Sequence, residues 1–256
     1  MKFNTLGNKS NPAVLFFHAM GVTGESSIPV AEYLKDSYYC IMPTATVYCQ
    51  DQEYKSKEDE VRQVETFLKK QGIHHLTLVV ASSLGADLAT YFLSQTKLPV
   101  DHVFFDGGQF AQIPSALRCI MTPFLYLAIR SFYWTNAKSL KHILWCDDEA
   151  IRPYFIAAGK NLRYKNLRRQ LRDSVKNEPF PMLPKELQEH TFWEFGTIED
   201  HFKYRNNVIQ RYKYGNFPVF KNYNHMQFQI RDPEGFAEML LSVIKNNRLT
   251  DQPFIA

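Results

Sequence analysis

The stretch Val79-Val80-Ala81-Ser82-Ser83-Leu84-Gly85-Ala86 decides how the rest of the chain is interpreted. An apolar run that begins at Leu76 passes directly into small residues and then into a helical pattern. A tight turn between a buried strand and a helix brings backbone close to backbone, so it needs small residues on both sides of its apex. Ala81 and Gly85 lie two residues before and two residues after Ser83. We therefore predict a strand–turn–helix unit with Ser83 at its apex.

Strand-like and helix-like segments alternate along most of the chain. Short continuous apolar runs are typical of strands buried on both faces, as in a parallel sheet, and the segments between them have helical spacing. The expected strands cover residues 12–18, 39–43, 76–80, 102–105, 191–195 and 217–220, and the expected helices 25–38, 56–71, 86–95, 204–212 and 233–247. This order predicts an α/β fold with a mostly parallel central sheet and helices on both faces.

The alternation is interrupted between residues 109 and 183. Helical patterns rich in Tyr, Phe, Leu and Arg occur there without a convincing strand. We predict a core formed by residues 1–108 and 184–256 and a helical insertion at 109–183. Within the insertion, residues 160–172 predict one amphipathic helix with a basic face. Such a face is either simply solvated or attracts an anionic substrate, a membrane surface or RNA.

Composition places the chain among ordinary globular proteins. It has 256 residues, of which 45% are hydrophobic and 22% charged, and this excludes a wholly disordered, collagen-like or coiled-coil protein. The formal net charge of +4 is weak evidence for a polyanionic partner. No phosphate loop, G-x-G-x-x-G, RNP-like motif or helix-turn-helix pattern occurs, so we expect no nucleotide or nucleic-acid partner. No His/Asp/Glu cluster has metal-ligand spacing, so we expect neither a metal nor a cofactor.

The sequence also bears on location. No apolar stretch typical of a signal peptide follows Met1, and the apolar segment 119–134 is interrupted by Pro123 and Arg130 and is too short to span a bilayer. The cysteines, at positions 40, 49, 119 and 146, lack C-x-x-C spacing and are expected to be reduced thiols. We expect a cytoplasmic protein without stable membrane association.

The residues around Ser83 match a known functional pattern. Small-x-Ser-x-small corresponds to the nucleophile elbow G-x-S-x-G, with alanine in place of the first glycine. The alternative is a small-residue turn whose serine only caps the following helix. Ser82 is the weaker candidate nucleophile, because Ala81 and Leu84 would then flank the apex. The strand–turn–helix context favours Ser83 as a nucleophile.

A second segment, Phe16-Phe17-His18-Ala19-Met20-Gly21, follows the first expected strand. At this point the chain resembles the α/β-hydrolase family, whose first core strand usually ends in a His-Gly turn; here Ala19 stands in place of the glycine. The resemblance implies that the backbone N–H groups of Met20 and Leu84 form an oxyanion hole. It also implies that the insertion is a helical cap, in which residues 119–129 could form an apolar roof over the site.

The resemblance extends to the C-terminal part. Asn222-Tyr223-Asn224-His225-Met226 lies in a loop after the last expected strand, where the family has its general base, and this implies His225. The family's acid commonly follows in Gly-x-x-Asp/Glu, which from Gly196 gives Glu199. Asp200 is the reserve acid and Asp106 a third option. His201 could line the site.

Ser83, Glu199 and His225 occur in the chain order nucleophile, acid, base of this family. The resemblance implies a serine hydrolase that cleaves a carboxylic ester or related acyl bond of a small molecule through an acyl-enzyme. One alternative keeps the fold but changes the reaction to acyl transfer, C–C bond hydrolysis or a lyase reaction. Another is a ligand-binding homologue without catalysis. The sequence leaves the oligomeric state open.

Overall fold

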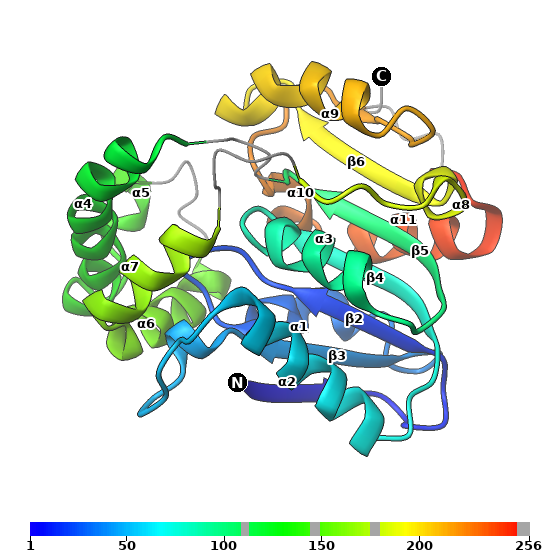
Figure 1. Cartoon of the computed structure of the whole chain (residues 1–256), viewed down its shortest axis with the longest axis horizontal. Coiled ribbons are helices and arrows are strands. Elements are labelled where there is room, and N and C mark those ends of the chain that lie inside the picture. Colours follow the sequence, from blue (N-terminus) through cyan, green and yellow to red (C-terminus); the bar gives the residue numbers. More distant parts are fainter. Residues whose placement is uncertain (109–112, 144–148, 175–179, 250–256) are drawn as a thin grey trace.

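The computed structural model describes residues 1–108, 113–143, 149–174 and 180–249. Within these residues a twisted sheet of seven strands runs through the core in the order β1-β3-β2-β4-β5-β6-β7 (Figure 1). At one edge β1 pairs antiparallel with β3, and all other neighbours are parallel. The strands are β1 (Lys2–Leu6), β2 (Ala13–Phe17), β3 (Tyr39–Thr44), β4 (Leu76–Ser82), β5 (Val100–Asp106), β6 (Thr191–Gly196) and β7 (Val219–Phe220).

Helices cover both faces of this sheet. Because side chains alternate along a strand, Leu15 and Phe17 of β2 pack on one face with α2, α3 and α9, whereas Val14 and Phe16 pack on the other with α1 and α11. The core helices are α1 (Ile28–Ala31), α2 (Lys57–Lys70), α3 (Gly85–Gln95), α9 (Arg205–Arg211), α10 (Gln227–Arg231) and α11 (Pro233–Asn246). The predicted α/β class, with its mostly parallel sheet, is confirmed.

Four helices between β5 and β6 form a separate layer at one end of the sheet (Figure 1). They are α4 (Ser115–Trp134), α5 (Leu140–Ile143), α6 (Arg152–Asn161) and α7 (Tyr164–Asp173), whereas α8 (Lys185–Glu189) packs against the core at the other end. Ile129 and Phe132 of α4 pack with Phe155 of α6, and this cluster continues into Val47 and Tyr48, which follow β3. Among the described helices, none has both the length and the apolar character required to cross a membrane.

Several local predictions were wrong. The helix expected at 25–38 is a 3₁₀ turn, Gly24–Ser27, followed by the short α1, because turns at 32–37 bring the chain back to begin β3 at Tyr39. The edge strand β1 and the short helix α10 were not predicted. Pro123 does not break α4, which continues through it. Of the four cysteines, Cys146 lies outside the described residues, and the other three are free thiols.

The basic helix expected at 160–172 is two helices. α6 ends at Asn161, and the next residue, Leu162, is extended and buried in the cluster between the insertion and the core. Two amide side chains hold the segments on either side of this break. Asn161 donates to the carbonyl of Tyr48, and Asn166 of α7 donates to the carbonyl of Gln52. The burial of Leu162 and these two hydrogen bonds stabilise the break between α6 and α7.

Candidate active site

Ser83 lies at a strained turn between β4 and α3. Its φ of +51° is in the left-handed region, which non-glycine residues rarely occupy without a strong local constraint. A Cβ on Gly85 would lie 2.4 Å from the carbonyl oxygen of Phe17, so only glycine fits there without displacing β2. Ala81, by contrast, is fully buried within β4, which shows that a methyl group fits in place of the first glycine of the motif. The predicted strand–turn–helix unit therefore has Ser83 at its apex.

His225 extends from the loop after β7 and lies between two other side chains. Its Nε2 atom is 2.8 Å from Ser83 Oγ, and its Nδ1 atom is 2.6 Å from Glu199 Oε2. The next residue, Met226, has a φ of +56° and begins the turn into α10, which reverses the chain. This arrangement suits a neutral imidazole that donates from Nδ1 to the carboxylate and accepts the serine proton at Nε2.

The structure distinguishes Glu199 from its neighbour. The Glu199 side chain is fully buried, with one oxygen on His225, whereas Asp200 is exposed and forms no hydrogen bond or ion pair with the imidazole. Gly107, at the end of β5, explains how the pair fits together. A Cβ there would lie 2.5 Å from His225 Nδ1 and 3.1 Å from Glu199 Oε2, and its φ of +58° already favours glycine. Of the candidate acids, Glu199 is thus the one that contacts His225.

Asp106, the third option, belongs to a different pair. It lies opposite Glu194 of β6 in the sheet, and the two buried carboxyl groups hydrogen-bond to each other. Burial raises the pKa of Asp106 to about 6 and holds the pKa of Glu194 well above its usual range. Gln229 of α10 donates to Asp106 and, at 3.0 Å, to Ser82 Oγ. The pair therefore retains a proton near neutral pH, and Gln229 joins it to the Ser82 hydroxyl.

Sequence analysis did not find Glu194 or Gln229. One signal was present for the first, because Glu194 is the one charged residue of the expected strand 191–195 and lies between Trp193 and Phe195. A carboxyl group in a strand that is buried on both faces requires a hydrogen-bonding partner. Gln229 had no such signal, because the helix that carries it was not expected.

His201 lies beside the imidazole of His225, with ring centroids 4.8 Å apart. Burial, followed by the neighbouring His225, lowers the pKa of His201 to about 4. Possible ligand atoms of Glu199, His201 and His225 all lie within 4.8 Å of one another, so these residues could hold a metal ion. His225 Nδ1 and Glu199 Oε2 are however joined by a short hydrogen bond, which a metal would have to displace.

The turn after β2 is held by two buried side chains. His18 Nδ1 donates to the carbonyl of Ala19 at 2.7 Å, and its Nε2 accepts from the N–H of Ala45 at 2.9 Å. Both contacts require a neutral ring, and burial lowers the pKa of His18 to about 4. The Tyr48 hydroxyl accepts from the N–H of Gly21 at 2.7 Å. Together these bonds fix the backbone on both sides of Met20.

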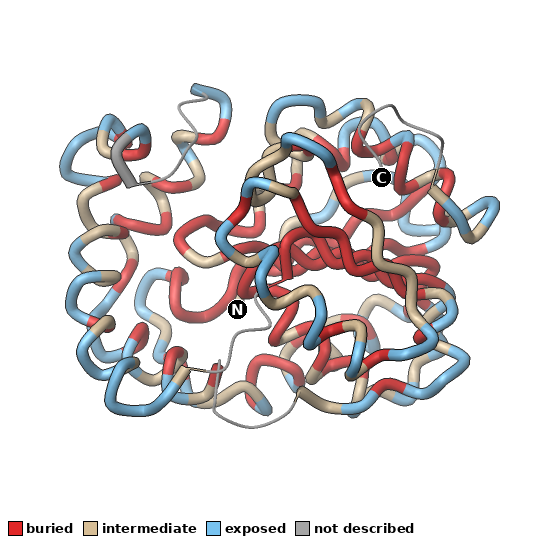
Figure 2. Tube along the Cα trace, turned by 90° about the horizontal axis from the view of Figure 1, so that it is seen from above, coloured by how far each residue is buried: buried red, intermediate tan, exposed pale blue. Residues whose placement is uncertain are grey.

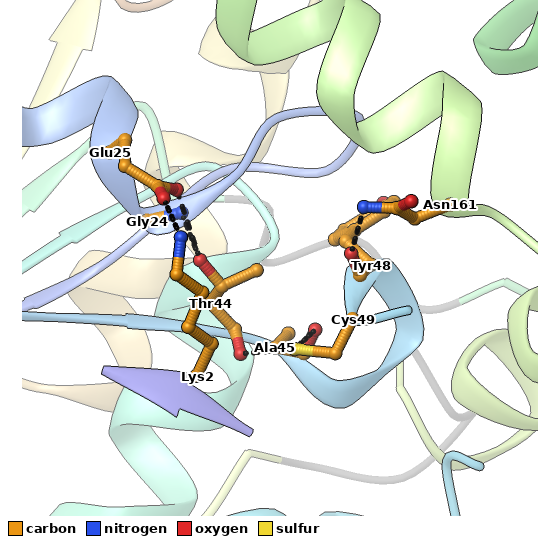
Figure 3. A network of polar contacts seen from close by, with 8 residues as sticks. All are labelled: Lys2, Gly24, Glu25, Thr44, Ala45, Tyr48, Cys49 and Asn161. Atoms are coloured by element: carbon orange, nitrogen blue, oxygen red, sulfur yellow. Dashed lines mark hydrogen bonds and ion pairs between the residues drawn. The ribbon is translucent and has the colours of Figure 1, made fainter. Parts of the chain in front are cut away.

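Figure 3 shows how the segment that carries Tyr48 is itself anchored. Asn161 of α6 donates to the carbonyl of Tyr48 at 3.2 Å, which joins the insertion to the core. Thr44, at the end of β3, accepts from the N–H of Gly24 at 2.9 Å and contacts Glu25, which also pairs with Lys2. The turn after β2 is thus connected to both β3 and the helical insertion.

The N–H groups of Met20 and Leu84 are open. Neither donates a hydrogen bond within the described part of the chain, and both residues line the same small cavity between the sheet edge and the insertion. Leu84 directly follows Ser83 and precedes α3, so its N–H belongs to the unpaired first turn of that helix. Two open donors near Ser83 can stabilise a negatively charged oxygen.

Comparisons with known proteins bear on the fold. No protein-family model matches the sequence, and no curated protein matches it by sequence. Solved structures do match. An α/β-hydrolase family protein from Desulfitobacterium hafniense has a TM-score of 0.73 at 13% identity and covers 95% of this chain and all of its own. A structure from the study of carboxylesterases of Nitrososphaera gargenis has a TM-score of 0.71 at 12% identity, with 96% of both chains covered.

A third match is the carboxylesterase CesB from Bacillus subtilis, with a TM-score of 0.68 at 14% identity, covering 95% of this chain and 87% of its own. The three matches cover at least 95% of this chain and so include both core and insertion. The chain therefore has the α/β-hydrolase fold, as the sequence motifs led us to expect.

Proposed function

We propose that the protein is a serine hydrolase that cleaves a carboxylic ester or a related acyl bond of a small molecule. In this proposal Ser83 is the nucleophile, His225 the general base and Glu199 the acid that orients it. The single observation that carries it is the continuous hydrogen-bonded chain from Ser83 Oγ through the His225 ring to Glu199 Oε2. The left-handed conformation of Ser83 supports the same assignment, because strained apices of this kind occur at functional sites.

The reaction proceeds in two halves. In the first, His225 Nε2 takes the hydroxyl proton as Ser83 Oγ attacks the acyl carbon, and the departing alcohol then takes that proton as the ester bond breaks. In the second, His225 takes a proton from water, the resulting hydroxide attacks the acyl-serine, and Ser83 leaves with the proton. Glu199 remains a carboxylate throughout and stabilises the transient imidazolium.

The N–H groups of Met20 and Leu84 bind the oxyanion that forms in each half. Their support is that both lack an acceptor within the described residues and line one cavity beside Ser83. A single donor of this kind typically contributes about 3 to 4 kcal/mol to the stabilisation of the transition state. His18 and Tyr48 act on this hole as positioning residues, through Ala19 and Gly21.

The test is turnover of p-nitrophenyl esters from acetate to decanoate by the native protein, Ser83→Ala and Ser82→Ala. Ser82 is the matched control, because it is adjacent and hydroxylated but bonded to Gln229. We expect native turnover of at least one ester of the series, a loss of at least about 10³-fold in Ser83→Ala, and near-native rates in Ser82→Ala. A folded native protein without turnover of any ester would contradict the proposal, and equal activity of Ser83→Ala would contradict the assignment of the nucleophile.

A further inference from the structure

The outward face of α4 is apolar over the whole helix. Large apolar residues recur at intervals of three, four and seven positions, which places them on one side of a helix. Their side chains are about half or more exposed: Leu117 (47%), Ile120 (62%), Phe124 (69%), Leu127 (53%) and Trp134 (57%). We call these five residues the α4 ridge. Contiguous exposed apolar surface of this kind marks an interaction site, whereas single exposed apolar residues are ordinary.

The ridge is not the packed side of the helix. Ile129 and Phe132 on the other side are buried, and the Phe132 ring lies 5.0 Å from that of Phe155 in α6. The charged residues of α4 are Arg118 and Arg130. Both bond backbone carbonyls of neighbouring helices: Arg118 donates to the carbonyl of Arg172, and Arg130 to that of Gly159. Arg130 also lies 5.3 Å from the ring centroid of Trp134, so a charge borders the C-terminal end of the ridge, whereas no charged residue of α4 lies on the ridge between Leu117 and Leu127.

A basic groove of about 440 Å³ lies beside α4, between it and α7. The cations that line it are Arg118, Lys165, Arg168, Arg169 and Arg172, and no carboxylate of the described residues lines it. Two carboxylates reach these cations from outside: Glu53 pairs with Lys165 and Arg169, and Asp173 with Arg172. Arg168 is exposed and makes no ion pair with a described residue. The groove thus keeps an excess of positive charge.

The groove and the ridge form one continuous surface. Each residue of a helix is rotated by about 100° from the one before it. This rotation places Ala116 and Pro123 between Cys119, which lines the groove, and Ile120 of the ridge. All four of these residues are exposed. The insertion lies at the left end of the molecule in Figures 1 and 2, and the outer side of its tube is largely pale blue in Figure 2.

We propose that the α4 ridge and the basic groove together dock the protein on an anionic lipid bilayer. The ridge enters the boundary between headgroups and acyl chains, and the groove binds the phosphates of anionic headgroups, with Arg168 as its free cation. A helix with Leu, Phe and Trp on one side and Lys or Arg beside it has the composition of an interfacial element. This proposal replaces the expectation, drawn from the sequence, of no stable membrane association.

Charge favours a bilayer over a second copy of this chain. A symmetric dimer through α4 would place the same patch of both copies face to face and bring two basic grooves together. Like charges across an interface oppose association, whereas anionic lipids attract the same cations at about 1 kcal/mol for each Lys or Arg near the surface. A bilayer offers both the anionic phosphates that the groove attracts and a continuous apolar layer for the whole length of the ridge.

The experiment is co-sedimentation of the full chain with vesicles of phosphatidylcholine alone and with vesicles containing equal amounts of phosphatidylcholine and phosphatidylglycerol. We expect at least about tenfold tighter binding to the anionic vesicles, and a loss of this preference as sodium chloride screens the cations. Arg168→Glu should weaken binding to anionic vesicles by about tenfold, whereas Lys9→Glu, the same change at an exposed lysine in the loop before β2, should leave it unchanged.

The apolar part is tested by a triple variant, Ile120→Ser, Phe124→Ser and Leu127→Ser. The control is Tyr33→Ser, which alters a similarly exposed apolar residue outside the helical insertion. We expect at least tenfold weaker binding for the triple variant and no change for Tyr33→Ser. Ser83→Ala should bind as the native protein does, so the result does not depend on catalysis. If the triple variant does not fold, Arg168→Glu and the salt dependence still decide the outcome.

Three outcomes would overturn the proposal. One is equal binding, or no binding, to the two kinds of vesicle. Another is a native dimer in sedimentation velocity that the triple variant converts to a monomer, since the ridge would then be an interface between two copies. The third is unchanged anionic binding in Arg168→Glu and in the folded triple variant.

Discussion

The carboxyl edge of the sheet and the outward face of α4 depart in opposite directions from the usual distribution of side chains. At the sheet edge, the carboxyl groups of Glu199, Asp106 and Glu194 are buried. On α4, Phe124 and Ile120 are among the most exposed large apolar residues of the described chain. Burial of carboxyl groups and exposure of apolar groups both reduce stability, so each region suggests a function that outweighs this cost.

The two regions differ in how their unusual side chains are stabilised. Each buried carboxyl group has a partner within the fold: Glu199 bonds His225, and Asp106 bonds Gln229 and Glu194. The site is therefore held in place before any substrate arrives. Among the described residues, only Trp134 of the ridge has a partner of this kind, the guanidinium of Arg130. For the other ridge residues, stabilisation of the exposed side has to come from another molecule. The sheet edge is preorganised for chemistry, whereas α4 is available for association.

The largest effect is expected from the buried acid. Glu199→Gln preserves the shape but removes the charge that stabilises the protonated His225, and it allows the wrong tautomer. We expect the ester turnover rate to fall by about 10³- to 10⁴-fold, while the free energy of unfolding changes by no more than about 1 kcal/mol. Asp200→Asn is the matched control and should retain native turnover, because Asp200 is exposed. Equal losses of turnover in the two variants would contradict the assignment of Glu199, and not Asp200, as the acid.

The next effect compares two phenylalanines on opposite sides of α4. Phe132 is 3% exposed, and Phe124 is 69% exposed. Phe132→Ala should lower the free energy of unfolding by about 3 to 5 kcal/mol, because it leaves a cavity against Phe155. Phe124→Ala should change it by no more than about 0.5 kcal/mol. Urea denaturation of both variants measures the difference, and a loss above about 2 kcal/mol in Phe124→Ala would show that the ridge is packed.

A third prediction compares two glycines that both have positive φ. Alanine at either Gly107 (φ +58°) or Gly72 (φ +71°) incurs about 1 to 2 kcal/mol of backbone strain. Only at Gly107 would the added Cβ collide with His225, since nothing lies within 4 Å of the position at Gly72. We expect Gly107→Ala to lower ester turnover by about 10²-fold and Gly72→Ala to retain it. Thermal melts should show the loss from backbone strain alone in Gly72→Ala and a larger loss in Gly107→Ala.

Should Gly107→Ala keep native turnover, His225 and Glu199 would have room to move without losing their alignment. The description of the sheet edge as preorganised would then be wrong.

The smallest effect concerns the carboxyl pair. The raised pKa of Asp106, about 6, means that the folded state binds its proton more tightly than the unfolded state does. The stability that this gives is present at low pH and is lost as the pH rises through about 6. Glu194→Gln removes the neighbouring ionisable group, so it should raise stability at pH values above 7 and have little effect near pH 4. If the substitution lowers the pKa of Asp106 by about one unit, the free energy of unfolding above pH 7 rises by about 1.4 kcal/mol.

Urea denaturation at the two pH values measures this effect, with Glu65→Gln on the surface of α2 as the control. A gain that is larger at the lower pH would contradict the sign of the argument.

Local patterns in the sequence predicted much of the core and the site. Buried parallel strands are continuous apolar runs, so β2, β3, β4, β5 and β6 were visible, and the small residues around Ser83 fixed its turn. Glu199 and His225 could be placed only through the resemblance to a family, because the distance between them depends on the packing of separate loops. Only the family spacing from Gly196 favoured Glu199 over Asp200, since burial of one and exposure of the other arise from the turn after β6.

The insertion was predicted less well, and the reason is physical. Periodicity shows that Ile120 and Phe124 share a helix face, but it does not show which side of the helix meets the core. Residues 119–129 could form a roof over the site according to the sequence, and the structure shows only that Ile120, Phe124 and Leu127 are exposed and Ile129 is buried. Similarly, β1 was not predicted because it lies at the sheet edge, where its residues are only partly buried and form no continuous apolar run.

The most direct test of the central claim, that Ser83 is an activated nucleophile, is labelling with a fluorophosphonate probe followed by intact-mass spectrometry. The account predicts one adduct on the native protein, the same adduct on Ser82→Ala, and none on Ser83→Ala. Slower labelling of Glu199→Gln should accompany this result, because the His225 base loses its orienting partner. An adduct that persists in folded Ser83→Ala, or a folded native protein that takes up no probe, would contradict the claim.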